Sequence, residues 1–251
     1  MVKQKEQKKD LKFEKRNKRH IDSMSKDNEF KKISRRWFLH SVKHEYSYHF
    51  EWLGLPIIQY PQDIMAYQEI IWNVKPDLII ETGIARGGSL VLSASMLQLI
   101  GKGQVLGIDI NIEKENRKRI ETHFLKKRIK MIQGSSIDEN IIKQVKKIAK
   151  NKKKIIVVLD SNHAHEHVLK ELENYSQFVK KGCYLIVFDT IIEDIPQRIA
   201  KKTKRAWGKG NSPKSAMKEF LKKNSRFVMD TKIDDKLQIS VAPNGYLKCI
   251  R

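Results

Sequence analysis

Nine residues, E-T-G-I-A-R-G-G-S from Glu81 to Ser89, constrain the fold of this chain more than any other segment. They follow the apolar run Leu78-Ile79-Ile80 and lead into a second one, Leu90-Val91-Leu92. This pattern predicts a strand, a glycine-rich turn and a helix start, a layout that brings a ligand to a helix N-terminus. The spacing is not G-x-G-x-x-G, so the dinucleotide-binding fingerprint is absent.

The composition of the turn indicates what kind of ligand it binds. An acid ends the predicted strand, and Gly83, Gly87 and Ser89 follow it. This set suits a ligand that carries both an ammonium and a carboxylate group, and S-adenosylmethionine is the obvious example. The alternative is a tight structural turn with no ligand, since glycine also serves turns that need a positive φ.

Beyond this turn, strand and helix patterns alternate along the chain. Such alternation predicts an α/β fold with a doubly wound, mostly parallel sheet. The segment from Arg226 to Lys248 resembles two antiparallel strands around Asp234-Asp235, which would add an antiparallel C-terminal strand. The predicted strands are 77–82, 104–109, 128–133, 154–160, 182–189 and 237–242, and the predicted helices are 65–72, 88–100, 113–126, 138–150, 164–180 and 213–223.

Three regions follow from composition: a basic arm (1–36), an aromatic-rich entry or lid segment (37–76) and a Rossmann-like domain (77–251). Basic residues outnumber acids more than two to one in the arm. It is either a solvated, flexible or helical tail or an electrostatic anchor to an anionic membrane or polysaccharide. The net charge of +22 comes largely from lysine scattered through every segment. Without an aromatic platform or a recognisable motif, we expect no nucleic-acid partner.

The cellular compartment is predicted from cysteine usage and from the N-terminus. Cys183 and Cys249 are the two cysteines and have no paired spacing, which indicates free thiols in a reducing compartment. The first ten residues are charged and contain no apolar core of a signal peptide. We therefore expect a cytoplasmic protein, with the basic arm as a peripheral contact at the inner membrane face and homo-oligomer formation left open.

The predicted strands end in polar residues that are candidates for a site. Ligands of open α/β sheets bind outside the carboxyl ends of the strands. Asp109 ends the second strand, where an acid binds ribose hydroxyls in nucleotide folds. Asp160 and Asp189, with the hydroxyl of Thr190, form an oxygen-rich set of the Mg²⁺ type. The alternative for either aspartate is a simple helix cap.

Three histidines follow the fourth predicted strand in D-S-N-H-A-H-E-H. A zinc site would need a further ligand from a defined partner motif, which the sequence does not offer. We expect His163 to accept a proton in the site, because imidazole titrates near neutral pH. We expect His165 and His167 to be packing or capping residues.

Several segments together carry a resemblance to a known family. E-T-G-I-A-R-G-G-S, G-S-S-I-D, V-L-D-S-N-H and V-F-D-T resemble the metal-using O-methyltransferases of the catechol type, which depend on S-adenosylmethionine. From Trp52 to Lys248 the chain resembles the cephalosporin hydroxylase family more closely, through W-L-G-L-P-I-I-Q-Y-P-Q-D, L-D-S-N-H-A-H-E-H-V-L-K-E-L and A-W-G-K-G-N-S-P-K-S-A-M-K-E-F-L. This family has a class I methyltransferase fold, and its relatives include sugar and rhamnosyl O-methyltransferases.

The resemblance implies a role for each matching residue. Asp109 would bind the ribose and Ser136 would lie by the adenine. Thr190 stands where catechol-type enzymes carry an amide, and His163 stands where they place a lysine base. Members of the cephamycin pathway have an acid where this chain has Phe188, which predicts weaker metal binding here. The methionine part of the cofactor would lie against Glu81, Gly83, Gly87 and Ser89, and Mg²⁺ against Asp160 and Asp189.

The leading hypothesis is a Mg²⁺-assisted O-methyltransferase acting on a sugar, a glycan or a small hydroxylated metabolite, with His163 and Asp160 as catalytic residues. One alternative is an oxygenase-type hydroxylase, although no two-histidine, one-carboxylate triad is evident at a suitable spacing. Another is a silent binding or scaffold protein in polysaccharide biosynthesis. Residues 208–216 either start a helix at its proline or close over the acceptor, and the aromatic segment 37–60 is a second candidate wall.

Overall fold

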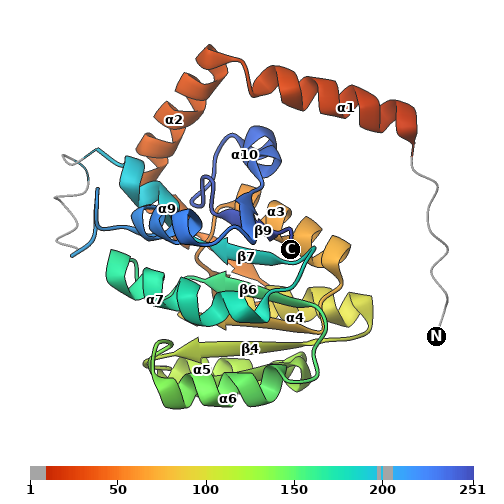
Figure 1. Ribbon diagram of the computed structural model, residues 1–251, viewed down its shortest axis with the longest axis vertical. Helices are drawn as coiled ribbons and strands as arrows, with labels where there is room; N and C mark the ends of the chain where they lie inside the picture. Colours follow the sequence, from red (N-terminus) through yellow and green to blue (C-terminus); the bar gives the residue numbers. More distant parts are fainter. Residues whose placement is uncertain (1–9, 197–198, 200–205) are drawn as a thin grey trace.

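A computed structural model describes residues 10–196, 199 and 206–251 of the chain. Its centre is a seven-stranded sheet with the strand order β5-β4-β3-β6-β7-β9-β8 (Figure 1). The strands from β3 to β7 run parallel, whereas β8 and β9 pair antiparallel at one side. Their bounds are Leu78–Thr82 (β3), Gln104–Asp109 (β4), Ile129–Gln133 (β5), Ile155–Leu159 (β6), Tyr184–Val187 (β7), Phe227–Met229 (β8) and Tyr246–Cys249 (β9).

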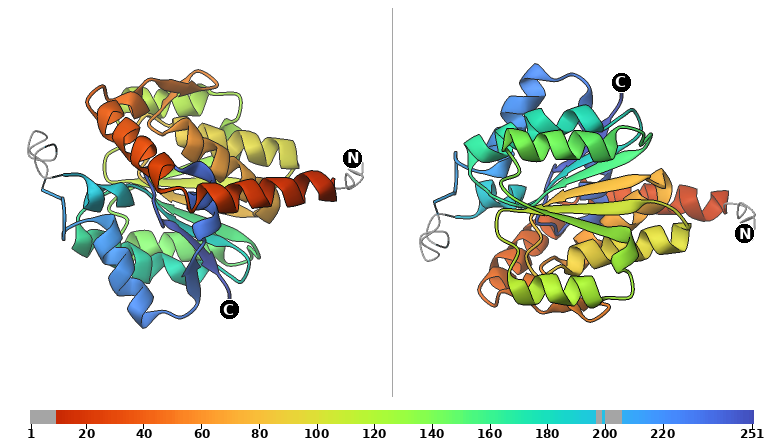
Figure 2. Two further views of the ribbon diagram at one scale, coloured as in Figure 1. Left: turned by 90° about the horizontal axis from the view of Figure 1, so that it is seen from above. Right: turned by 90° about the horizontal axis from the view of Figure 1, so that it is seen from below.

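Helices cover both faces of this sheet, with α4 and α5 on one face and α6 and α7 on the other (Figure 2). The strand order reverses between β3 and β6, so the predicted doubly wound, mostly parallel sheet with an antiparallel C-terminal strand is confirmed. The helices are α3 (Pro61–Val74), α4 (Gly88–Ile100), α5 (Lys114–Thr122), α6 (Glu139–Ala149), α7 (His165–Tyr175), α9 (Pro213–Lys223) and α10 (Thr231–Leu237).

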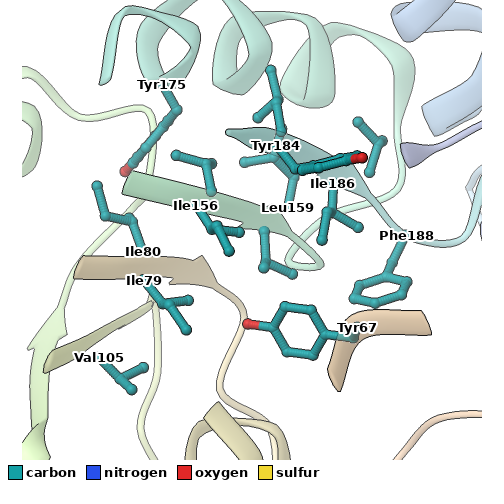
Figure 3. Packing of buried hydrophobic residues seen from close by; sticks show 14 of the residues in the cluster. Tyr67, Ile79, Ile80, Val105, Ile156, Leu159, Tyr175, Tyr184, Ile186 and Phe188 are labelled. Carbon is teal, nitrogen blue, oxygen red and sulfur yellow. The ribbon is translucent and has the colours of Figure 1, made fainter. Parts of the chain in front are cut away.

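The core fills the space between the sheet and its helices. Strands β3, β6 and β7 are buried along their whole length, as expected for central parallel strands. Figure 3 shows Tyr175 of α7 on one side of these strands and Tyr67 of α3 on the other. The Tyr67 hydroxyl shares a hydrogen bond of 2.8 Å with Ser93 of α4, so the two helices of that layer are joined inside the core.

The C-terminal region differs from its prediction in one element. The predicted strand 237–242 is wrong, because Leu237 ends helix α10 and residues 238–242 form a loop. The apolar alternation there is real, but Asp63 of α3 accepts the Val241 amide at 2.9 Å and the Ser240 hydroxyl at 2.6 Å, which takes this backbone away from the sheet. Asp234 and Asp235 lie within α10, and the antiparallel strands stand on either side of that helix.

The N-terminal region holds helices α1 (Leu11–Met24) and α2 (Asn28–Val42) and a hairpin of β1 (Phe50–Trp52) and β2 (Leu55–Ile57). Helix α1 contacts α10 but buries none of its own residues. Helix α2 buries one face, which carries Ser34, Phe38 and Ser41. The predicted arm boundary at residue 36 therefore lies inside α2, and residues 1–9 of the arm lie outside the described part. Within the described part, no helix is both long and apolar enough to cross a membrane.

Candidate active site

The carboxyl ends of four neighbouring parallel strands meet at one edge of the sheet. The register pairs Thr82 of β3 with Ile108 of β4 and with Leu159 of β6, so the residues that follow these strands lie side by side. Strand β7 lies next to β6, as predicted from the right-handed winding of such folds. This edge gathers the acidic residues Glu81, Asp109, Asp160 and Asp189.

The glycine-rich turn after β3 requires glycine for steric reasons, as Gly83 and Gly87 show. Gly83 has φ +89°, and a Cβ there would stand 2.1 Å from the backbone oxygen of Asp160. Gly87 precedes α4 with φ +87°, and its Cβ would stand 2.5 Å from Ile120 Cδ1. The turn therefore packs directly against the backbone of the β6 end.

Asp109 organises the same turn from the end of β4. Its Oδ2 accepts the backbone N–H of Ile84 at 2.8 Å, and its Oδ1 accepts that of Asn111 at 3.1 Å. An ionised carboxylate offers about four lone-pair sites, so acceptor capacity remains for a ribose hydroxyl. The position fits the role implied by the resemblance, with the additional task of holding the turn.

Glu81 is buried at the base of the turn, with 2% of its surface exposed. The Ser89 hydroxyl of α4 donates to Glu81 Oε1, but Oε2 has no hydrogen-bond partner among the described residues. Burial raises the pKa of Glu81 to about 7, although the hydrogen bond from Ser89 lowers it. A buried carboxylate with an unpaired oxygen is costly unless a donor or cation reaches it, so Glu81 fits a ligand ammonium.

The ends of β6 and β7 bring together Asp160, His163 and Asp189. One ligand atom of each lies within 4.8 Å of the others, the arrangement that could hold a metal ion. His163 Nε2 stands 3.2 Å from Asp189 Oδ2, and the His163 ring meets Trp207 edge-on with centroids 5.0 Å apart. Asp189 adopts a left-handed backbone conformation with φ +55°, which is uncommon for a residue other than glycine and is often found at functional sites.

Asp160 stands out in this cluster because its pKa is strongly shifted. Its pKa lies well above its ordinary value, first because it is removed from water and then because the charges of Asp189 and Glu81 are close. The side chain of Gln59, in the segment between β2 and α3, donates to Asp160 Oδ2 at 3.3 Å. A divalent cation here would relieve the repulsion between the two aspartates, so this residue set fits a metal ion.

Thr190 is fully buried next to Asp189. Its hydroxyl donates to the backbone oxygen of Pro243 at 2.9 Å and so holds the loop before β9. Its hydrogen is therefore already used, and a lone pair of the oxygen is what remains for a cation. Of the three residues predicted to bind the metal, Asp160 and Asp189 lie together with His163. Thr190 instead makes a hydrogen bond to the backbone of Pro243.

Ser136 lies in the loop between β5 and α6, in a second group of polar residues. Its hydroxyl stands 3.1 Å from His167 Nε2, and its backbone oxygen accepts the Tyr175 hydroxyl at 2.9 Å. The Ser161 hydroxyl, next to Asp160, donates to the buried Glu171 at 2.8 Å. His167 is therefore a packing residue that joins the loop to α7, as the sequence predicts.

His165 also has a structural role, as the sequence predicts. Its Nδ1 stands 2.7 Å from the Ser215 hydroxyl and its Nε2 stands 3.2 Å from Glu219, so it joins α7 to α9. Residues 208–216 follow the helix-start interpretation, with Ser212 as the N-cap in a capping box and Pro213 at the first position of α9. Neither His165 nor His167 belongs to the cluster found among the described residues, which disfavours the zinc alternative.

A cavity of about 490 Å³ opens onto the cluster of Asp160, His163 and Asp189. Its polar lining includes Gln59, Asp160, His163 and Asp189, and aromatic side chains form much of the remaining wall. The aromatic rings come from the predicted wall and from one position that sequence reasoning missed, Trp207. Tyr46 packs on Tyr60 with centroids 5.5 Å apart. The lining aromatic residues are Phe38, Tyr46, Tyr48, Tyr60 and Trp207.

The chain matches a family model described as rhamnosyl O-methyltransferase/CmcI over residues 44–250. Among curated proteins it is 32% identical over 205 residues to the rhamnosyl O-methyltransferase of Mycobacterium tuberculosis (strain H37Rv), covering 78% of this chain and 76% of the relative. The protein of the same name from Mycobacterium leprae is 30% identical over 148 residues, covering 58% of this chain and 62% of the relative.

Solved structures of the same architecture have lower sequence identity. CmcI with Mg and SAM matches with a TM-score of 0.52 at 19% identity, covering 81% of this chain and 78% of the other. An O-methyltransferase from Bacillus cereus in complex with SAH matches with a TM-score of 0.50 at 12% identity, covering 90% of this chain and 92% of the other. At these identities the likeness concerns the fold alone.

Proposed function

Because the chain belongs to the rhamnosyl O-methyltransferase/CmcI family, we propose that it transfers the methyl group of S-adenosylmethionine to a hydroxyl of a sugar or small hydroxylated metabolite, with Mg²⁺ at Asp160 and Asp189. The resemblance inferred from the sequence is confirmed by the family match over residues 44–250. The prediction of an O-methyltransferase is confirmed at the level of the family. The cofactor, the metal and the acceptor are the parts proposed for this chain.

One observation carries the proposal: the unpaired, buried carboxylate oxygen of Glu81 lies below a glycine turn that ends against Asp160. The cofactor would place its amino-acid end against Glu81 and Ser89 and its ribose against Asp109. When bound, S-adenosylmethionine supplies an activated methyl group on a sulfonium. The protein's part is then to align the acceptor oxygen and to help remove its proton.

The residues of the cluster divide this work. Mg²⁺ prefers hard oxygen ligands, so the carboxylates of Asp160 and Asp189 are its natural holders here, and it would lower the pKa of a nearby hydroxyl as a Lewis acid. His163 lies against Asp189, which orients the ring. If Nε2 carries the hydrogen that faces Asp189, Nδ1 is the nitrogen left to accept a proton from the acceptor.

The aromatic lining of the cavity supports a sugar acceptor. Tyr46, Tyr60 and Trp207 line it beside the polar cluster. Aromatic rings bind the apolar faces of sugars while the polar groups hold the hydroxyls, and the curated relatives are named for a rhamnosyl acceptor. A sugar hydroxyl is also the acceptor whose high pKa most needs both a base and a metal.

A calorimetric titration of S-adenosylhomocysteine and of S-adenosylmethionine, each with and without Mg²⁺, tests the proposal. We expect micromolar binding that weakens at least about tenfold in Asp109→Ala, and tighter binding with Mg²⁺ present. Absence of binding in all four titrations would contradict the proposal and favour the scaffold alternative. Iron-dependent oxygen consumption would instead favour a hydroxylase.

We further propose that the basic arm contacts an anionic membrane at its periphery. Helix α1 buries no residue, carries five basic side chains and exposes Leu11 and Phe13. Basic residues beside exposed apolar ones are typical of helices that lie on anionic lipid. Co-sedimentation with phosphatidylglycerol vesicles, but not with phosphatidylcholine vesicles, is expected for the full chain, and equal recovery with both would contradict the contact.

A further inference from the structure

A groove of about 580 Å³ lies along one face of helix α2. The residues that α2 and its C-cap contribute recur at intervals of three or four positions, which is the spacing of a single helical face. All but one of them are basic, and none of the described residues that line the groove is acidic. The contributing residues of this basic groove are Lys32, Arg35, Arg36, Leu39, His40 and Lys43.

The protein leaves much of the positive charge of the basic groove unneutralised. Neither Arg36 nor Lys43 forms an ion pair among the described residues, whereas Lys32 has an exposed one with Glu29 at 3.6 Å. Like charges four residues apart on a helix, such as those of Lys32 and Arg36, repel each other. A bound anion would reduce this repulsion, and phosphate is an anion that arginine and lysine side chains bind well.

The basic groove adjoins the cavity that opens onto the cluster of Asp160, His163 and Asp189. Phe38 of α2 lines that cavity, and Ile199 lines both the cavity and the basic groove. A molecule that occupies the cavity can therefore extend past Ile199 onto the basic face of α2.

A hydrogen bond holds the basic face of α2 next to the segment that follows β7. Arg35 donates to the backbone oxygen of Asp194 at 3.1 Å, while the Asp194 carboxylate pairs with Lys214. The acid closest to this contact is thus already bound to another cation. The charge of Arg35 remains available to an anion in the groove.

We infer that the basic groove binds a phosphate or diphosphate group carried by the acceptor sugar, so that the acceptor is a sugar phosphate or a nucleoside diphosphate sugar and not a free sugar. This inference rests on the proposed function. The aromatic cavity would hold the sugar with its hydroxyl near His163, and Arg36 and Lys43 would bind the phosphate. The volumes of the cavity and the groove are both within the range of small-molecule sites.

The basic residues of the groove all precede residues 44–250, the part of the chain that matches the family model. A preference for a phosphorylated acceptor would therefore depend on side chains that the family match does not include. The cofactor and metal residues, in contrast, all lie within the matched part.

The test uses the full chain and removes two charges from the groove. Isothermal titration without Mg²⁺ would measure inorganic pyrophosphate, glucose 1-phosphate and methyl glucoside against the wild type and the double variant Arg36→Gln, Lys43→Gln. The matched control is the double variant Arg119→Gln, Lys147→Gln. It also loses one arginine and one lysine, and these two exposed residues of α5 and α6 do not line the groove.

We expect pyrophosphate and glucose 1-phosphate to bind the wild type with dissociation constants below about 1 mM, and methyl glucoside to bind at least about tenfold more weakly. The groove variant should bind both phosphates at least about tenfold more weakly than the wild type, and the control should stay within about twofold. An equal loss in the two double variants would assign the binding to net charge and overturn the groove as a site. Equal affinity of the wild type for glucose 1-phosphate and methyl glucoside would also overturn it.

Two further measurements separate this inference from the other proposals. The affinity for S-adenosylhomocysteine should be the same in both double variants, and its absence in the wild type would contradict the proposed function independently of the phosphate titrations. Recovery with phosphatidylglycerol vesicles should be as large for the groove variant as for the wild type. Loss of vesicle recovery in that variant, with no binding of either soluble phosphate to the wild type, would assign the groove to lipid headgroups and overturn the phosphorylated acceptor.

Discussion

The hydroxyl of Tyr246 donates a hydrogen bond of 2.6 Å to the carboxylate of Asp63, and both side chains are completely buried. This contact joins the last strand of the sheet to the first turn of helix α3, almost the full length of the domain away in sequence. Ser240 and Val241 donate to the same carboxylate. One aspartate thus holds three points of the C-terminal segment to the N-terminal half of the fold.

Replacing Asp63 should destabilise the protein strongly. Asp63→Ala leaves the buried hydroxyls of Ser240 and Tyr246 without an acceptor, and we expect a loss of roughly 3 kcal/mol or more in the free energy of unfolding. Chemical denaturation monitored by circular dichroism would measure it. The isolated variant Tyr246→Phe removes one of the three donors and should cost less, so an equal loss in both variants would contradict a shared network.

The pH dependence of this network has a definite sign. Burial raises the pKa of Asp63 from 3.8 to about 6 in the folded protein. The folded state therefore binds the proton more tightly, and the contribution of this group to stability is full below pH 4 and is lost as pH rises through about 6. The difference in unfolding free energy between wild type and Asp63→Asn should change between about pH 4 and pH 6.5 and stay constant above about pH 7.

Glu81→Gln should raise stability and lower cofactor affinity. The pKa of Glu81 is raised to about 7 by burial, so the stability that its protonated form contributes is lost as pH rises through about 7. We expect a higher melting temperature than wild type at pH 8, a smaller advantage at pH 5.5 and little difference at about pH 4, together with at least about tenfold weaker binding of S-adenosylhomocysteine. A variant that is destabilised at pH 8 would indicate that Glu81 supports the fold.

For the wild-type protein, the same reasoning predicts that cofactor affinity falls as pH is lowered through about 7, because protonated Glu81 no longer attracts an ammonium group. Calorimetry at pH 6 and pH 8 would measure this. Glu81→Gln is the control and should show a flatter pH profile.

Gly83→Ala should be far more damaging than a glycine change with the same backbone angle elsewhere. At Gly83 a Cβ would stand 2.1 Å from the Asp160 backbone oxygen, whereas at Gly182, with φ +84°, it would meet nothing within 4 Å. We expect a loss of about 1 kcal/mol for Gly182→Ala and of several times that for Gly83→Ala. Similar melting temperatures for the two variants would contradict the close contact between the turn and β6.

His163→Ala should reduce turnover by about 10²-fold or more, since that is the usual contribution of a general base, without changing cofactor affinity. The assignment of His163 as a base requires that the Mg²⁺ dissociation constant change less than about threefold, because the two aspartates remain. A parallel loss of Mg²⁺ binding would assign His163 to the metal. Asp189→Asn is the matched variant and should weaken Mg²⁺ binding itself.

The acidic edge of the sheet was predictable because it follows from periodicity alone. Once alternating strands and helices predict a parallel sheet, the residues after each strand must meet, and Glu81, Asp109, Asp160 and Asp189 do so. The helix-start role of Ser212-Pro213 follows from local capping chemistry in the same way. Local rules suffice where the partner lies in the same segment.

Gln59 and Trp207 were not predictable in this way, because each enters the site from a loop far away in sequence. Nothing in the apolar context of Gln59 indicates that its amide bonds to Asp160. The false strand at 237–242 has the same origin: its alternation indicates a strand, and a buried carboxylate on a distant helix decides otherwise. Long-range polar contacts leave no periodic trace in the sequence.

Asp160 belongs to two sites at once, so binding at one site must affect binding at the other. Asp160 lines a small cavity beside Glu81 and Ser89, and it also belongs to the cluster with His163 and Asp189. A positive charge at one location therefore changes the electrostatic potential at the other. The ammonium group of the cofactor and Mg²⁺ partly compete for the charge of Asp160, while each reduces the repulsion between Asp160 and its neighbouring carboxylates. Whatever factor Mg²⁺ applies to the affinity for the cofactor, the cofactor must apply to the affinity for Mg²⁺. The affinities for the two ligands are therefore linked through one aspartate.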